Sequence, residues 1–154
     1  MNANAVKMQT QMFIRRPAAE VFEAFVDPAI TTQFWFTKSS GRLDAGMPVL
    51  WTWEMYGAEA RVIVRALEPD RRILIDWGDP SDMTTVEWRF AEQSGGTMVT
   101  ITNTGFKGDD DSIVAQAVDS SQGFTIVLCG LKALLEHGLR LNLVADRAPD
   151  AHVK

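Results

Sequence analysis

The chain has 154 residues, a formal net charge of −5 and 46% hydrophobic residues. This length predicts a single domain, which can bury about two thirds of the surface that the unfolded chain exposes. The acidic balance argues against a partner such as nucleic acid or an anionic membrane, since each requires a basic surface.

The cysteine content and the hydropathy pattern bear on location. One cysteine, Cys129, cannot form an intramolecular disulfide, so a reducing cytoplasm is favoured. No stretch approaches the roughly 18 consecutive apolar residues of a membrane span, and the N-terminus lacks a basic region followed by an apolar run. We therefore expect a cytoplasmic protein with no membrane segment, with residues 1–154 forming one domain and flexible termini at 1–5 and 145–154.

Residues 6–14 are expected to form the first strand, and two short helices should follow it directly. Pro17 and Pro28 each suit a first helical turn, where a missing N–H has no effect, and Asp27 can cap the second helix. Apolar residues recur at helical spacing in both segments. They are Ala18, Val21, Phe22 and Phe25 in the first, and Ile30, Phe34 and Trp35 in the second.

Residues 47–77 alternate between apolar and polar side chains, with short turn signals between the runs, which predicts consecutive antiparallel strands. Tyr56 and Gly57 suit a two-residue hairpin turn. That turn would place Trp53 opposite Ala60, with the neighbouring residues following in register.

Two more strands are expected around 86–90 and 99–102, joined by a turn at 94–96. The acidic run 109–111 can cap a helix and complement its dipole, and no proline follows until after Val144. This predicts a long amphipathic helix, either alone or preceded by a separate short one. Its apolar face would hold Ala117, Ser121, Phe124, Leu128, Leu131 and Leu135.

This order of elements resembles the START/Bet v 1-like (SRPBCC) superfamily, and within it the activator of heat-shock-protein-90 ATPase homologue-like proteins. The motifs that carry the resemblance are Pro17 with 21–25, Asp27 with Pro28, 33–35, 51–53, 67–69, and Gly123 with Phe124. The resemblance implies an α+β helix-grip fold. A curved antiparallel sheet of about seven strands would wrap around the long C-terminal helix, with two short helices after the first strand.

The resemblance also implies an apolar cavity between the sheet and the last helix, which takes a lipid, a sterol or a polyketide-like molecule. Four tryptophans share the predicted inner face, and residues 34–36 would stand at the mouth. The same side chains could instead fill the core at native density. The ligand-binding candidates are Phe34, Trp35, Phe36, Trp51, Trp53, Met55, Val62, Ile75, Trp77, Trp88, Phe90, Phe124 and Leu128.

Several polar residues are candidates for catalysis or ligand binding. By strand alternation, the charged candidates fall opposite the tryptophan face, where cross-strand pairs such as Glu54 with Arg61 are expected. Tyr56 could reach the cavity rim from its turn, although a structural role is favoured. No nucleophile motif accompanies His137 or His152. The charged candidates are Glu54, Arg61, Asp76, Glu87 and Arg89. We assign no catalytic residue, metal or cofactor.

Three functions remain open on the sequence. The first is binding of a hydrophobic small molecule, and the second is a polyketide cyclase or dehydratase, which the superfamily includes. The third is a co-chaperone-like module that stimulates an ATPase, with residues 34–36 as contacts. The superfamily also allows a homodimer.

Overall fold

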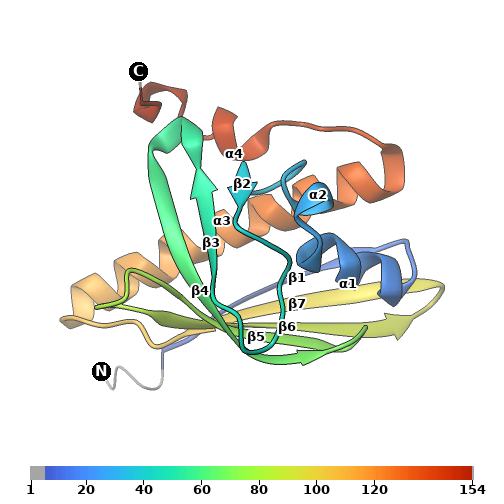
Figure 1. Ribbon diagram of the computed structural model, residues 1–154, viewed down its shortest axis with the longest axis horizontal. Helices are drawn as coiled ribbons and strands as arrows, with labels where there is room; N and C mark the ends of the chain where they lie inside the picture. Colours follow the sequence, from blue (N-terminus) through green and yellow to red (C-terminus); the bar gives the residue numbers. More distant parts are fainter. Residues whose placement is uncertain (1–5, 154) are drawn as a thin grey trace.

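The protein folds as a curved antiparallel sheet with one long helix across its concave side (Figure 1). This computed structural model describes residues 6–153. The expected flexibility of residues 1–5 therefore lies outside the described residues. The predicted α+β helix-grip architecture is confirmed.

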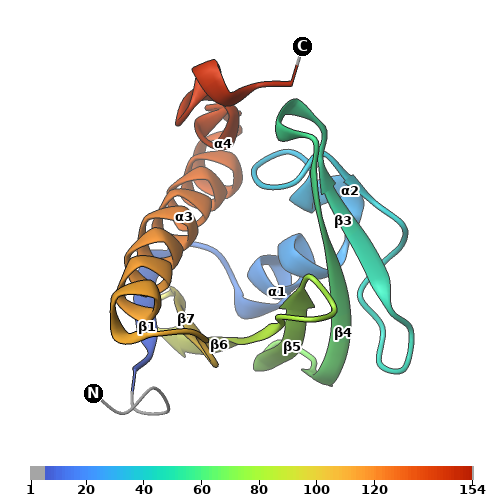
Figure 2. The ribbon, with the colours of Figure 1, turned by 90° about the vertical axis from the view of Figure 1, so that its left-hand side faces the viewer.

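Seven strands form the sheet, in the order β1-β7-β6-β5-β4-β3-β2, and every neighbouring pair is antiparallel. The strands are β1 (Met8–Ile14), β2 (Lys38–Ser39), β3 (Val49–Trp53), β4 (Ala58–Glu68), β5 (Arg72–Gly78), β6 (Thr84–Gln93) and β7 (Gly96–Thr104). Figure 2 shows β3 and β4 rising as a wall from a floor made by the other long strands. The register between β4 and β5 shifts between Val64 and Ala66, and such an irregularity lets a strand bend.

The two short helices are α1 (Ala18–Val26) and α2 (Pro28–Thr31). The side chain of Asp27 accepts a hydrogen bond from the backbone N–H of Ala29 at 3.0 Å, which confirms it as the cap of the second helix. Pro28 occupies the first turn of that helix, as expected. Buried apolar residues of α1 then pack into the concave side of the sheet.

The long helix α3 (Asp110–His137) begins where the acidic run predicts, since the side chain of Asp109 accepts from the N–H of Ser112 at 2.8 Å. The helix ends at His137, although no proline interrupts the chain before Val144. Gly138 adopts φ 66°, a left-handed conformation that glycine enters without strain and that ends a helix. The chain then turns back and forms the short helix α4 (Leu143–Asp146).

The hairpin between β3 and β4 differs from the predicted two-residue turn. Residues Glu54–Tyr56 form a 3-10 turn, with Gly57 in the left-handed conformation at its end. Trp53 consequently pairs with Ala58, rather than with Ala60. The slip is two residues, an even number, so each side chain stays on the face that alternation predicts.

The segment after α4 packs against the tip of this hairpin. It contains a second 3-10 turn, Pro149–Ala151, and the N–H of Val153 donates to the carbonyl of Met55 at 2.7 Å. The sequence predicts a flexible tail from residue 145, whereas the described part of that tail is tied to the domain by these bonds. Figure 2 shows it bridging from α4 toward the β3–β4 tip.

Candidate functional site

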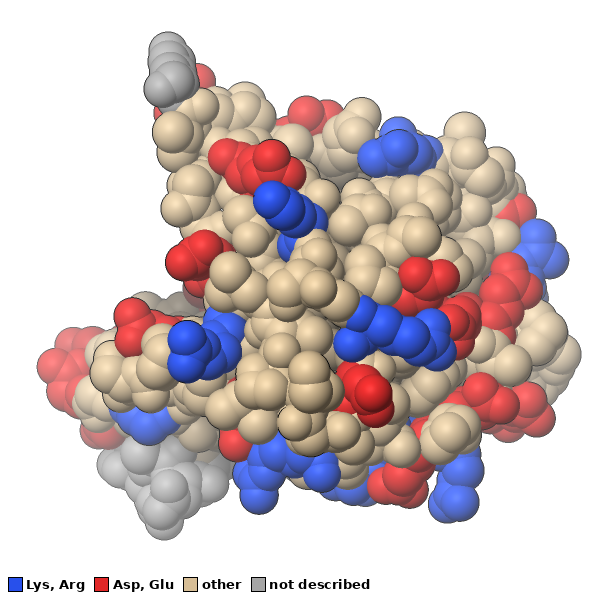
Figure 3. Space-filling model, in the orientation of Figure 1, with Lys and Arg blue, Asp and Glu red and all other residues tan. Residues whose placement is uncertain are grey.

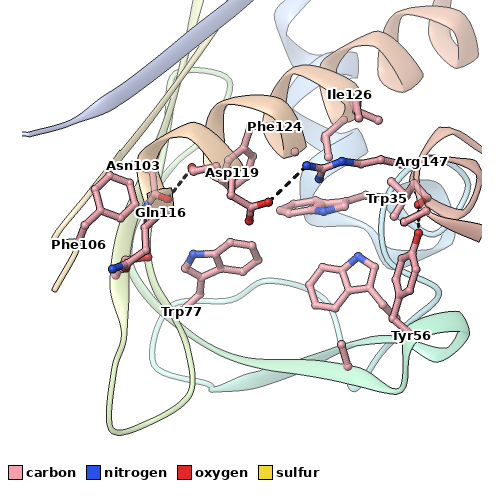
Figure 4. A pocket seen from close by; sticks show the side chains of 18 residues that line it. Trp35, Tyr56, Trp77, Asn103, Phe106, Gln116, Asp119, Phe124, Ile126 and Arg147 are labelled. Atoms are coloured by element: carbon pink, nitrogen blue, oxygen red, sulfur yellow. Dashed lines mark hydrogen bonds and ion pairs between the residues drawn. The ribbon is translucent and has the colours of Figure 1, made fainter. Parts of the chain in front are cut away.

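A cavity of about 660 Å³ lies between the middle of α3 and the inner face of the sheet (Figure 4). Its volume falls in the range of small-molecule sites. Its apolar walls come from the sheet, from α3, from the loop before α3 and from the segment between α2 and β2. They include Trp35, Trp53, Trp77, Phe106, Phe124 and Val127.

Trp35 lies at the centre of the aromatic cluster that forms one wall. Its ring centroid is 4.9 Å from that of Trp51, 5.8 Å from Trp77 and 5.7 Å from Phe124. All three pairs are tilted or edge-to-face, so none is a face-to-face sandwich, the arrangement that the charge distribution of aromatic rings disfavours. Only 7% of Trp35 is exposed, so it is a wall residue held by its neighbours and not a side chain at the mouth.

Asn103 supplies a polar corner on the inner face of β7. Its side-chain NH₂ donates to the hydroxyl of Thr84 at 3.1 Å and to the carbonyl of Thr85 at 2.8 Å. Its side-chain oxygen accepts from Ser120 of α3 at 2.8 Å (Figure 4). The buried amide therefore ties two strands to the long helix beside the cavity.

Arg147 reaches the cavity from the segment after α4. Its guanidinium lies 3.3 Å from the carboxylate of Asp119 and donates to the side-chain oxygen of Gln122 at 2.8 Å. The side chain of Asp119 is 80% exposed, so this ion pair contributes little to stability. Arg147 also passes over Gly123, where a Cβ atom would lie 3.7 Å from its nearest nitrogen.

The thirteen ligand-binding candidates divide into three groups in the structure. Four line the cavity, namely Trp35, Trp53, Trp77 and Phe124. Phe34 and Met55, again with Trp35, line a smaller hollow of about 90 Å³ beside it, under the loop that follows α3. The others pack in the core and line neither space: Phe36, Trp51, Val62, Ile75, Trp88, Phe90 and Leu128.

The sequence predicts that residues 34–36 stand at the mouth of the cavity, but the structure buries all three. Phe36 is 1% exposed and stacks on Trp51 with centroids 4.7 Å apart. Phe34 is also buried, and α3 approaches it closely at Gly130. The chain passes beneath α3 before it enters β2, and the aromatic side chains of residues 34–36 therefore face inward.

The sequence analysis missed most of the α3 side of the cavity. The apolar face of α3 that contains Leu128 and Leu131 packs on the sheet. A neighbouring strip of the same helix lines the cavity. That strip holds Gln116, Asp119, Ser120, Gly123 and Val127. Gly123 was the available signal, because glycine inside a helix lowers helix propensity and can mark space beside the backbone.

Asn103 was also detectable, since strand alternation from Val99 and Ile101 places it on the inner face. Arg147 was not, because its position depends on the reversal at Gly138. Tyr56 lines the cavity from its turn, and its hydroxyl donates a hydrogen bond to the carbonyl of Val144.

The charged candidates on the strands lie away from the cavity. Arg72 pairs with Glu87 at 2.7 Å, and Arg65 lies 3.5 Å from Asp76. The expected pair between Glu54 and Arg61 is wrong, because Glu54 belongs to the 3-10 turn and Arg61 lies opposite Leu50.

Within residues 6–153, three carboxyl groups have lowered pKa values, and none of them lines the cavity. A hydrogen bond from Arg42 is the main cause that lowers the pKa of Glu23. The N–H and hydroxyl of Ser81 lower the pKa of Asp79. Burial alone would raise the pKa of Glu136, but hydrogen bonds from Lys132 and the Arg15 N–H outweigh it. These shifts therefore belong to structural contacts.

Within residues 6–153, no group of three or more His, Cys, Asp or Glu side chains could hold a metal ion. In the same part of the chain, no helix is both long and apolar enough to cross a membrane. On the face shown in Figure 3, acidic and basic side chains are interspersed.

The family described as activator of Hsp90 ATPase homolog 1-like protein matches residues 15–136. The chain belongs to this family. The resemblance stated from the sequence is thereby confirmed, and with it the assignment to the SRPBCC-type folds. No match was found among curated proteins.

Solved structures agree with the family. The protein SSP2350 from Staphylococcus saprophyticus is 32% identical, with a TM-score of 0.76 over 88% of this chain and 96% of that one. DynU16, described as a putative protein in the dynemicin biosynthetic locus, is 19% identical, with a TM-score of 0.77 over 87% of this chain and 48% of that one. An Aha1 dimer from Colwellia psychrerythraea is 17% identical, with a TM-score of 0.72 over 86% and 98%.

Proposed function

We propose that this protein binds a hydrophobic small molecule of the lipid, sterol or polyketide-like classes in the cavity between the sheet and α3. The observation that carries the proposal is the 660 Å³ space walled by Trp35, Trp53, Trp77 and Phe124. Apolar walls with a few placed polar groups suit such ligands. The protein would act in the cytoplasm, consistent with its single free thiol, Cys129.

Packing supports a true cavity over a filled core. The seven core candidates listed above already fill the space beneath the sheet, yet open volume remains against α3. A small-molecule ligand gains support from DynU16, whose description places that protein in the dynemicin biosynthetic locus. Its identity is low, so the likeness rests on the fold.

Tryptophan fluorescence tests the proposal directly, because three of the five tryptophans line the cavity. The protein is titrated with a fatty acid, a sterol and an aromatic polyketide. At least one class should give a saturable change. No change with any of the three would contradict the proposal.

A blocking variant separates the cavity from other binding surfaces. Gly123→Met adds a side chain on the cavity face of α3, where a Cβ meets only Arg147 within 4 Å. Affinity for the binding class should fall at least about tenfold, by roughly 1.4 kcal/mol. Val118→Met is the matched control, since Val118 lies on the exposed face of the same helix. Equal affinity of the two variants would place binding elsewhere.

A cyclase or dehydratase remains a second candidate because the cavity is not purely apolar. Tyr56, Asn103 and Asp119 all line it. However, the Asn103 side chain is already engaged by Thr84, Thr85 and Ser120. A general acid or base must reach the substrate, so turnover of a bound polyketide that is lost in Asp119→Asn would favour this candidate.

The co-chaperone function that the family description suggests has less support here. The contact residues proposed for it, Phe34–Phe36 in the sequence, are buried. Co-purification with an Hsp90-type ATPase, together with stimulation of its ATP hydrolysis, would support the co-chaperone function. Self-association is a separate proposal, prompted by the description of the Colwellia psychrerythraea protein as a dimer, and sedimentation equilibrium tests it.

A further inference from the structure

The indole N–H groups of Trp35, Trp53 and Trp77 have no hydrogen-bond acceptor within residues 6–153. Trp88 differs from them, because its N–H is sealed in the core and is the one buried side-chain polar atom of that range without a partner. The other three belong to residues that line the cavity. Figure 4 shows the rings of Trp35 and Trp77 along its walls.

An indole nitrogen is a donor only, so each of these groups can be satisfied solely by an acceptor. Water can serve while the cavity is hydrated. A hydrocarbon ligand would displace that water and leave the donors unpaired, which is unfavourable in an apolar site. A ligand that carries an oxygen acceptor would replace the water and keep a donor satisfied.

Other groups add to the donor character of the walls. The hydroxyl oxygen of Thr84 accepts from the Asn103 side chain, so its own hydrogen is left to point to another acceptor. Arg147 brings a guanidinium to the rim. The clearest opposing group is the carboxylate of Asp119 on α3, which is 80% exposed and already pairs with Arg147.

We propose that the ligand is an apolar ring compound bearing at least one hydrogen-bond-acceptor oxygen, of the ketone or carboxylate kind, seated against the indole N–H groups of Trp35, Trp53 and Trp77. This inference rests on the proposed function, and it narrows the ligand class to ring compounds with an acceptor over plain hydrocarbons.

Two probes of nearly equal shape test the inference. Fluorene and 9-fluorenone are three-ring compounds that differ by one carbonyl oxygen, and their affinities are measured by equilibrium dialysis. The ketone should bind at least about tenfold more tightly. A carbonyl buried without a donor would weaken binding, so tighter binding requires donors at the site.

Variants identify the donors. Trp53→Phe and Trp77→Phe each remove one N–H from a partly buried position and keep an aromatic ring. At least one should reduce the preference for the ketone by about threefold or more, while fluorene binding changes less. Using the ratio of the two affinities removes any general effect of the substitution on the cavity.

The outcomes distinguish the two proposals. If both probes bind to the wild-type protein, are blocked by Gly123→Met, and show equal affinity, the acceptor inference is overturned and cavity binding stands. If the ketone is preferred but both tryptophan variants keep the full preference, the assignment to these donors is overturned. If neither probe binds, the cavity function and the inference both fail for ring compounds.

Discussion

The hydroxyl of Tyr56 donates a hydrogen bond to the carbonyl oxygen of Val144 at 2.5 Å. The bond joins the tip of the β3–β4 hairpin to α4, and both residues line the cavity. His152 reinforces the contact, with its ring 5.3 Å from that of Tyr56 and its Nε2 2.9 Å from the carbonyl of Ala145. The family match ends at residue 136, so this closing segment lies beyond it.

Tyr56→Phe should loosen that segment without unfolding the domain. Loss of one hydrogen bond costs about 0.5–1.5 kcal/mol, so amide exchange should accelerate about 2- to 10-fold in α4. The amides of Asp146 and Arg147 report this, since each bonds within the α4 turn. The amide of Leu128 in α3 is the internal control and should not change. Unaltered exchange at both α4 amides would show that Tyr56 does not hold the segment.

Two helix glycines should respond differently to alanine. At Gly123 the added Cβ meets only Arg147, at 3.7 Å, so the higher helix propensity of alanine should stabilise the protein by about 0.5–1 kcal/mol. At Gly130 the Cβ would lie 3.4 Å from both the Cβ and the carbonyl oxygen of Phe34. That crowding should cancel the gain.

Urea unfolding at neutral pH measures both glycine variants. The free energy of unfolding of Gly123→Ala should be higher than that of the wild type. That of Gly130→Ala should equal the wild-type value or fall below it. Equal stabilisation by the two substitutions would mean that α3 does not approach the Phe34 segment as closely as described.

The Glu136 carboxylate predicts a pH-dependent contribution to stability. It accepts from the Arg15 N–H at 2.9 Å and from Lys132 at 2.7 Å, and its side chain is 9% exposed. Burial opposes its charge, but these hydrogen bonds prevail and lower its pKa in the folded state. A lowered folded pKa stabilises the protein above the unfolded pKa of 4.5, and this stabilisation is lost as pH falls through the folded value.

Glu136→Gln should therefore cost about 1–3 kcal/mol at pH 7, as for a hydrogen-bonded charged group, and progressively less below pH 4.5. Unfolding free energies measured at several pH values test this. Glu20→Gln is the control, because the side chain of Glu20 makes only an exposed pair with Arg16, at 3.7 Å, among the described residues. If the loss of stability caused by Glu136→Gln instead grew as pH falls, the stabilising role of the Glu136 carboxylate would be contradicted.

The elements built from short-range signals could be predicted from the sequence. Asp27 and Asp109 cap the helices that their positions indicate, and the alternation in β5 to β7 gives the correct faces. These features depend on side chains within a few residues of each other. The β3–β4 register could not be obtained this way, because the turn at Glu54–Tyr56 packs against a segment about 90 residues later.

Only part of the cavity lining could be predicted from the sequence, and the reason is related. Period-2 alternation identifies which tryptophans face inward, but it does not show which of them contact other side chains and which contact open space. Trp51 and Trp88 are enclosed by Trp35 and Phe25, whereas Trp53 and Trp77 lie nearer α3, where Gly123 leaves room. That distinction arises from the placement of the helix.

The five tryptophan indole N–H signals in a two-dimensional ¹⁵N–¹H spectrum test the central claim most directly. After assignment by single Trp→Phe variants, 9-fluorenone is added to saturation. The signals of Trp35, Trp53 and Trp77 should shift most, because these residues line the cavity, and those of Trp51 and Trp88 should shift least. A saturated complex in which the three cavity signals keep their positions would contradict the claim.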